Sequence, residues 1–237
     1  MPELEPILGA VAGGVFPALA WLWFWRREDA PHPEPRKLIA LAFLAGMVTV
    51  AVVIPLEKFV QPYLATQTLV FIAWSAIEEV MKFLAAYITV LWRREDDEPI
   101  DPVIYMVTVA LGFAAVENTL FLLSPLSGDT LVQTIVTGNL RFVGATLLHV
   151  LSSAVIGVFL AISFYKPRGA RLRFAAAGVI LAILLHSTFN FLILNAAEDH
   201  LLRTFGLVWL GLVFLLAVLE YIKRIHPAIR KQFLRRP

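Results

Sequence analysis

The 237-residue sequence contains no cysteine, and only 16% of its residues are charged. The lack of cysteine excludes disulfides, iron–sulfur clusters and catalysis by a thiol. The low charge is unusual, because a soluble domain carries about 25% charged residues. Two hydrolase signatures are also missing, namely the G-x-S-x-G turn and the H-E-x-x-H zinc motif. The last apolar segment lacks the lysine that a retinal protein would need.

Apolar residues make up 59% of the chain, and its mean hydropathy is +0.77. They recur in runs of about 20 residues, the length that an α-helix needs to cross a hydrocarbon core. We therefore expect an all-α, polytopic protein of the cell membrane, a single integral membrane domain over residues 1–237. The soluble connections are too short to fold alone. The seven predicted spans cover residues 6–25, 38–56, 68–92, 102–123, 140–165, 173–194 and 204–222.

Basic residues are distributed very unevenly between the connections. Sixteen of the twenty Lys and Arg residues follow the first, third, fifth and seventh spans, whereas the other side carries only Lys58 and Arg203. Cytoplasmic loops are the ones rich in Lys and Arg. We expect the N-terminus outside and the C-terminus in the cytoplasm, with the basic tail after Tyr221 against anionic lipid headgroups.

The longest outer connection, residues 124–139, is predicted to contain a short surface helix. Asp129 would cap this helix, which would run from Thr130 to Thr137. At the edge of the next span, Arg141 is expected to reach the interface, where it could hold a lipid phosphate or a substrate carboxylate.

Six ionisable residues lie well inside the predicted spans, although a charge at mid-membrane costs roughly 2.5–3.5 kcal/mol. Measured from the charged cytoplasmic ends at 1.5 Å per residue, four spans place such a group at a depth of about 20–25 Å. Scattered structural residues would have no reason to share one depth, so we expect one site in the outer half of the bilayer. The six are Glu78, Glu79, Lys82, Glu117, His149 and His186.

The charges of this group do not balance, since three carboxylates face one lysine. At least one acid must be protonated, share a proton with a histidine, or hold water or a metal. Glu78 and Glu79 point about 100° apart on a helix. We therefore expect that they cannot face the same partner: one would face the histidines, and Lys82 would fix the other. The spacing does not say which.

Acids and neutral histidines at one depth suit three mechanisms. A glutamate can activate water while His and Asn side chains stabilise the oxyanion. Two histidines and a glutamate can instead hold Zn²⁺. A proton or ion relay in a transporter or channel is the third possibility.

Four short motifs in this part of the chain resemble those of the PrsW family of membrane proteases, relatives of the CAAX prenyl endopeptidases and of bacteriocin-processing proteins. The sequences EEVMK (78–82), GFAAVEN (112–118), HVLSS (149–153) and HSTFN (186–190) occur in family order on four different spans. The resemblance covers roughly residues 70–195. It implies an intramembrane endopeptidase of the glutamic type, which works without a cofactor, with zinc as the alternative.

The resemblance also assigns roles to residues. It implies that Glu78 activates water, that Glu79 and Lys82 support it, and that His186 and Asn190 stabilise the oxyanion. Prenyl endopeptidases usually have a histidine where this chain has Glu117, so His149 or His186 is expected to take that histidine's part. The motifs add Phe113, Asn118 and Ser153 as supporting residues.

The implied substrate is a single-pass membrane protein, such as an anti-sigma factor cut on its extracytoplasmic side. No nucleic-acid partner is expected, and the sequence does not indicate an oligomeric state.

Overall fold

A computed structural model describes residues 4–28, 32–123, 131–194 and 198–233, and over these residues the chain is helical apart from short connections. The elements are α1 (Leu4–Glu28), α2 (Arg36–Val60), the 3-10 helix η1 (Gln61–Tyr63), α3 (Gln67–Thr89), α4 (Asp101–Leu123), α5 (Leu131–Ile162), α6 (Arg168–Leu194) and α7 (Glu198–Phe233). The all-α prediction is confirmed, and each of the seven predicted spans falls on one long helix.

Six of the described helices are long and apolar enough to cross a membrane; α3 is the exception. Glu78, Glu79 and Lys82 lie so centrally in α3 that every 18-residue stretch of this helix contains all three. The protein is thus a multi-pass integral membrane protein, while the seventh span and the orientation of the termini stay predictions.

The prediction for the outer connection is wrong in one respect. Instead of a separate helix over 130–137 and a span from residue 140, α5 is continuous from Leu131. The sequence LVQTIVTGNLRF contains no proline and only one glycine, so nothing ends a helix there. Asp129 lies outside the described residues.

Helix α4 is the centre of the bundle, and almost every residue in its first four turns is buried. Glycines let its neighbours approach. A Cβ on Gly46 would lie 2.0 Å from the Val109 carbonyl oxygen, and a Cβ on Gly112 would lie 2.0 Å from that of Phe43. Helices α2 and α4 therefore cross with their backbones in contact, as small residues allow in lipid.

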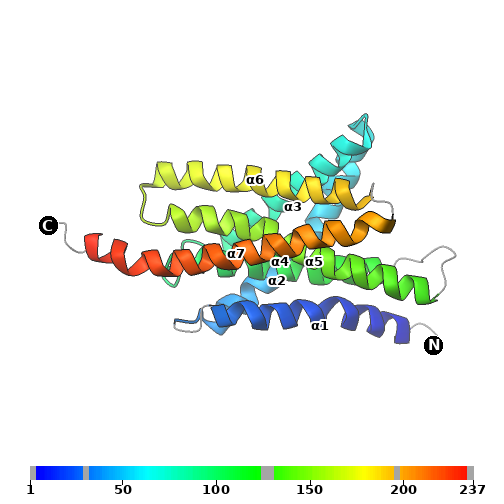
Figure 1. Cartoon of the computed structure of the whole chain (residues 1–237), viewed down its shortest axis with the longest axis horizontal. Coiled ribbons are helices and arrows are strands. Elements are labelled where there is room, and N and C mark those ends of the chain that lie inside the picture. The colour runs from blue at the N-terminus through cyan, green and yellow to red at the C-terminus, as the bar shows by residue number, and fades with distance from the viewer. Residues whose placement is uncertain (1–3, 29–31, 124–130, 195–197, 234–237) are drawn as a thin grey trace.

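The hairpin of α2 and α3 crosses the other helices at a steep angle, and its tip, η1, projects past α6 at the upper right of Figure 1. The N-terminal part of α3 is capped by Thr66, whose Oγ1 accepts a hydrogen bond from the Leu69 N–H at 3.3 Å. Through this crossing, α3 carries its three charged residues into the space between α4, α5 and α6.

Candidate active site

The six ionisable residues predicted to share a site do lie together. Helix α3 supplies Glu78, Glu79 and Lys82, and one residue comes from each of α4, α5 and α6: Glu117, His149 and His186. Oxygen and ring nitrogen atoms of both α3 glutamates and both histidines lie within 4.8 Å of one another. Four helices thus converge on one polar cluster inside an otherwise apolar bundle.

The ammonium group of Lys82 occupies the middle of this cluster and is fully buried. Its Nζ lies 2.8 Å from Glu79 Oε1, 3.2 Å from Glu78 Oε2 and 2.9 Å from His149 Nδ1. These three acceptors use all three of its N–H donors. The expectation that the two glutamates cannot share a partner is wrong, because the long lysine side chain places its ammonium between them.

Glu79 is a completely engaged carboxylate. It accepts hydrogen bonds from Lys82 Nζ and His186 Nδ1 at 2.8 and 2.9 Å, and from Ser152 Oγ and Ser153 Oγ at 3.0 and 2.9 Å. Its side chain has no exposed surface. Glu79 therefore ties α3 to α5 and α6, and it has no accessible lone pair left for a substrate or water.

Glu78 is held more loosely. Its only hydrogen bond from the described residues is the 3.2 Å contact between Lys82 and its Oε2. The same Oε2 lies 3.7 Å from His149 Nδ1 and 3.9 Å from His186 Nε2, and 8% of the side chain is exposed. Glu78 thus faces both histidines but lies beyond direct hydrogen-bond distance of either one.

The hydrogen bonds of His149 determine which of its ring nitrogens carries the proton in the neutral form. Because Lys82 can only donate, Nδ1 of His149 is the acceptor, and the proton of a neutral ring lies on Nε2. That Nε2–H donates to Glu117 Oε2 at 2.5 Å. Phe113 packs against both partners, with its ring 5.2 Å from the His149 ring and 4.3 Å from Lys82 Nζ. Glu117 is the open end of the network, with 45% of its side chain exposed.

His186 is oriented by Glu79. Since the carboxylate accepts from Nδ1, the second nitrogen, Nε2, faces Glu78. One helical turn further along α6, Asn190 lies on the same side and makes a 3.5 Å contact from Nδ2 to Ser75 Oγ. This is a weak hydrogen bond, so the amide can turn toward another acceptor.

The remaining predicted residues lie further from the cluster or bind it differently. Asn118 donates to Thr146 Oγ1 at 3.0 Å and joins α4 to α5. Ser153, predicted as a supporting residue, donates to Glu79. The side chain of Arg141 lies outside those that the structure describes.

Two nearby residues escaped sequence analysis. Ser152 is the second hydroxyl on Glu79, and the doubled serine of HVLSS was its signal. Glu57, at the end of α2, lies close enough for the charges of Glu78, Glu117 and Lys82 to act on it. It falls one residue beyond the predicted span, which is why it was not counted.

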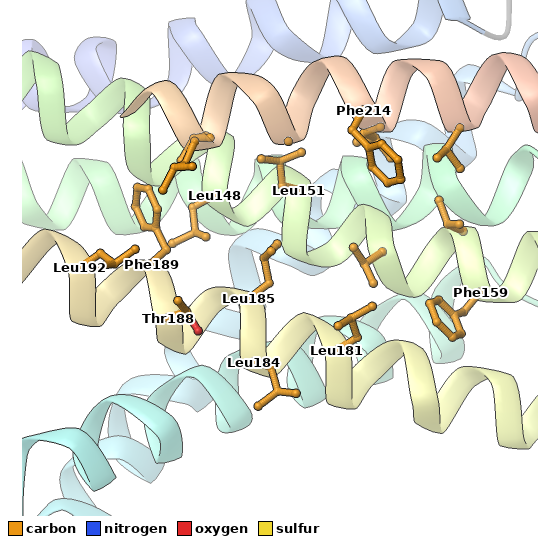
Figure 2. A pocket seen from close by; sticks show the side chains of 17 residues that line it. Leu148, Leu151, Phe159, Leu181, Leu184, Leu185, Thr188, Phe189, Leu192 and Phe214 are labelled. Carbon is orange, nitrogen blue, oxygen red and sulfur yellow. The ribbon is translucent and has the colours of Figure 1, made fainter. Parts of the chain in front are cut away.

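A groove of about 530 Å³ lies near the cluster but contains none of its residues. It runs between α5, α6 and α7, and its side chains in Figure 2 are apolar apart from Thr188. Leu148 and Leu185 line it, each next in sequence to a site histidine and pointing about 100° away. The groove is thus lipid-like in character and supplies no chemical group to the site.

The donor atoms of this cluster are also of the types that bind metals. Two histidines and glutamates are suitable ligands for Zn²⁺. However, the Lys82 ammonium lies within 3.2 Å of three of the four candidate ligands and takes the place of a cation among them. Because Lys82 binds Glu78, Glu79 and His149, and two serines also bind Glu79, this set of residues does not fit a resident metal.

Comparisons with known proteins agree on one family. The family model described as "PrsW family intramembrane metalloprotease" matches residues 34–219. Protease PrsW of Geobacillus kaustophilus is 28% identical over 232 residues, 94% of each chain. Protease PrsW of Bacillus subtilis is 23% identical over 190 residues, which cover 77% of this chain and 82% of the relative. No solved structure gives a significant match. The chain therefore belongs to the PrsW family of intramembrane proteases and is a membrane-embedded peptidase.

Proposed function

We propose that the protein is an endopeptidase of the glutamic type, in which Glu78 activates the water that attacks the peptide bond. The observation that carries the proposal is the contrast between two adjacent carboxylates. Glu79 accepts four hydrogen bonds, whereas Glu78 accepts one and faces both histidines. A general base needs a lone pair within reach of water, and Glu78 has it.

The reaction can be written with the residues in place. Water between Glu78 and His186 attacks the carbonyl carbon, and its proton passes to Glu78. The oxyanion accepts hydrogen bonds from Nε2–H of His186 and from the amide of Asn190. Glu78 then gives the proton to the amide nitrogen as the C–N bond breaks and the oxyanion reforms a carbonyl, which releases an amine and a carboxylic acid.

This scheme requires His186 to be protonated on both nitrogens. An imidazolium at this position would donate from Nδ1 to Glu79 and direct Nε2–H toward Glu78 and the oxyanion.

In this scheme the pair formed by Glu117 and His149 is a positioning element. His149 accepts a hydrogen bond from Lys82 and donates one to Glu117. Lys82 is therefore held between α3, α4 and α5. In the proposed scheme, water would reach the cluster from the side on which Glu117 is exposed.

For the substrate we propose a single-pass membrane protein, cut near the extracytoplasmic face. The basis is the depth of the four site residues together with the positive-inside orientation, both of which come from the sequence. An anti-sigma factor is one such substrate, implied by the family resemblance.

The experiment that tests this proposal compares cells that make the active protein with cells that make Glu78→Gln. Membrane-protein fragments with new N-termini should appear only with the active protein. Equal fragments in both strains, at equal protein levels, would refute the role of Glu78. The transport alternative would instead be favoured by a flux in liposomes that a pH gradient drives and that Glu117→Gln abolishes, with no proteolysis.

A further inference from the structure

A second polar pocket lies at the other end of α3, where that helix stops and α6 begins. It has a volume of about 230 Å³ and is lined by Trp92, Asp96, Arg168 and Arg171 together with apolar side chains from α3 and α6. The predicted orientation places it at the cytoplasmic membrane surface. None of the catalytic candidates lines it.

The backbone at this pocket is strained. Trp92 has φ = 74°, a left-handed conformation that is uncommon for a bulky residue and that clusters at functional positions. Its N–H donates to Asp96 Oδ2 at 3.1 Å. Its ring lies under the Arg171 guanidinium, at 4.2 Å, and beside the Tyr87 ring, at 5.7 Å. The fold therefore holds an acid, an arginine and an aromatic ring together at a cost in backbone energy.

Two buried polar atoms in this pocket have no hydrogen-bond partner among the described residues. They are Asp96 Oδ1 and Arg171 Nε. The acid and the arginine are near enough to interact electrostatically but form no direct ion pair. Unpaired buried polar groups are rare and call for a water, an ion or a ligand. Here the pocket offers one free acceptor and one free charged donor at the same time.

The surroundings restrict what can fill this pocket. Its volume lies below the roughly 300 Å³ of small-molecule sites, which suits a headgroup better than a whole ligand. Its apolar rim is exposed toward the lipid, with Leu84 39%, Tyr87 40% and Leu172 70% accessible. Acyl chains can lie along this rim while a polar headgroup enters the pocket.

We propose that the pocket binds the headgroup of a phospholipid that carries a primary amine. The phosphate would accept from Arg168 and Arg171, and the ammonium would donate to Asp96. Arginine suits phosphate because its guanidinium presents several donors in one plane. A quaternary amine has no N–H for Asp96, and an uncharged headgroup gives Asp96 no cation, so the pocket would discriminate among lipids by headgroup.

The test uses the purified full chain in detergent and short-chain lipids with three headgroups: phosphoethanolamine, phosphocholine and phosphoglycerol. Native mass spectrometry gives the fraction of protein that binds each lipid, and thermal unfolding checks the fold. We expect wild type to bind the primary amine roughly tenfold more tightly than the other two, as for one charge-assisted hydrogen bond. Water-soluble phosphoethanolamine serves as the probe for the headgroup alone.

Variants separate the two halves of the pocket. Asp96→Asn should abolish the preference for the primary amine, whereas Arg171→Gln should weaken the binding of all three lipids. Arg168→Gln tests the contact with the phosphate at an exposed position, so it disturbs no buried atom. The matched controls are Asp97→Asn and Arg173→Gln, which lie outside the pocket and should bind like wild type.

Equal binding of the three headgroups to wild type would overturn the proposal. So would a primary-amine preference that survives Asp96→Asn in a folded protein. Binding that inorganic phosphate alone reproduces would show an anion site rather than a lipid site, and would also overturn it.

Discussion

The two adjacent glutamates of α3 should differ sharply in their effect on stability. Glu79→Ala removes four hydrogen bonds, three of them to other helices, and leaves the buried Lys82 and His186 without their closest acid. Glu78→Ala removes one hydrogen bond of 3.2 Å on the edge of the cluster. The pair is matched in residue type, charge, helix and substitution, so each variant is the control of the other.

The magnitudes follow from the contacts. Interhelical hydrogen bonds in membranes contribute about 0.6 kcal/mol each, so the three from Glu79 give a lower bound of roughly 2 kcal/mol. Breaking a buried ion pair by removing one partner costs about 3–5 kcal/mol. We therefore expect Glu79→Ala to lose about 3–5 kcal/mol of unfolding free energy. Glu78→Ala should lose about 1 kcal/mol, because Lys82 then keeps its closer partner Glu79.

The assay is equilibrium unfolding in mixed micelles, followed by circular dichroism, for wild type and both variants in the same detergent. A third variant, Ser153→Ala, removes one of the hydrogen bonds to Glu79. It should lower the unfolding free energy by about 0.6 kcal/mol, and by about 1.7 kcal/mol at most. A Glu78→Ala variant as unstable as Glu79→Ala would contradict this prediction, since the described residues give Glu78 no equivalent set of partners.

Three further predictions test the packing, the metal and the pH dependence. Gly112→Ala should cost about 1–3 kcal/mol, because its Cβ would lie 2.0 Å from the Phe43 carbonyl oxygen, while Gly9→Ala, with nothing within 4 Å, should be neutral in the same unfolding assay. Cleavage should persist in excess chelator, with well under one zinc per purified chain; stoichiometric zinc that is lost in His149→Ala would instead favour the zinc mechanism. Burial raises the pKa of Asp96 above its ordinary 3.8, so its contribution to stability is complete below that pH and is lost as the pH rises through the folded-state pKa. Unfolding in lipid-free detergent, measured from about pH 4 upward, should show this loss in wild type and a flatter profile in Asp96→Asn.

Much of the fold could be predicted because lipid restricts the choices. Runs of apolar residues alone give the helices to within a few residues for most spans. The start of α5 was missed because the sequence from Leu131 onward is both a possible surface helix and a possible extension of a span. Periodicity alone cannot separate these two.

The residues that make up the cluster were also predictable, since charged residues inside spans are costly and the helical rise of 1.5 Å per residue gives their depth in the membrane. The hydrogen bonding within the site was not. Sequence spacing places Lys82 on the same face as both glutamates, but only the structure puts its ammonium between them and a histidine. Likewise, the contacts that distinguish Glu79 from Glu78 come from Ser152, Ser153 and His186, more than 70 residues away in the chain.

If Glu78 is the base, its replacement by glutamine should affect the chemistry rather than the structure. The most direct measurement is the cleavage rate of purified Glu78→Gln on a single-pass substrate, with unfolding free energy measured on the same sample. We predict a rate at least about 100-fold below wild type, the lower range for loss of a general base, at unchanged stability. A stable Glu78→Gln variant that cleaves at the wild-type rate would contradict the account.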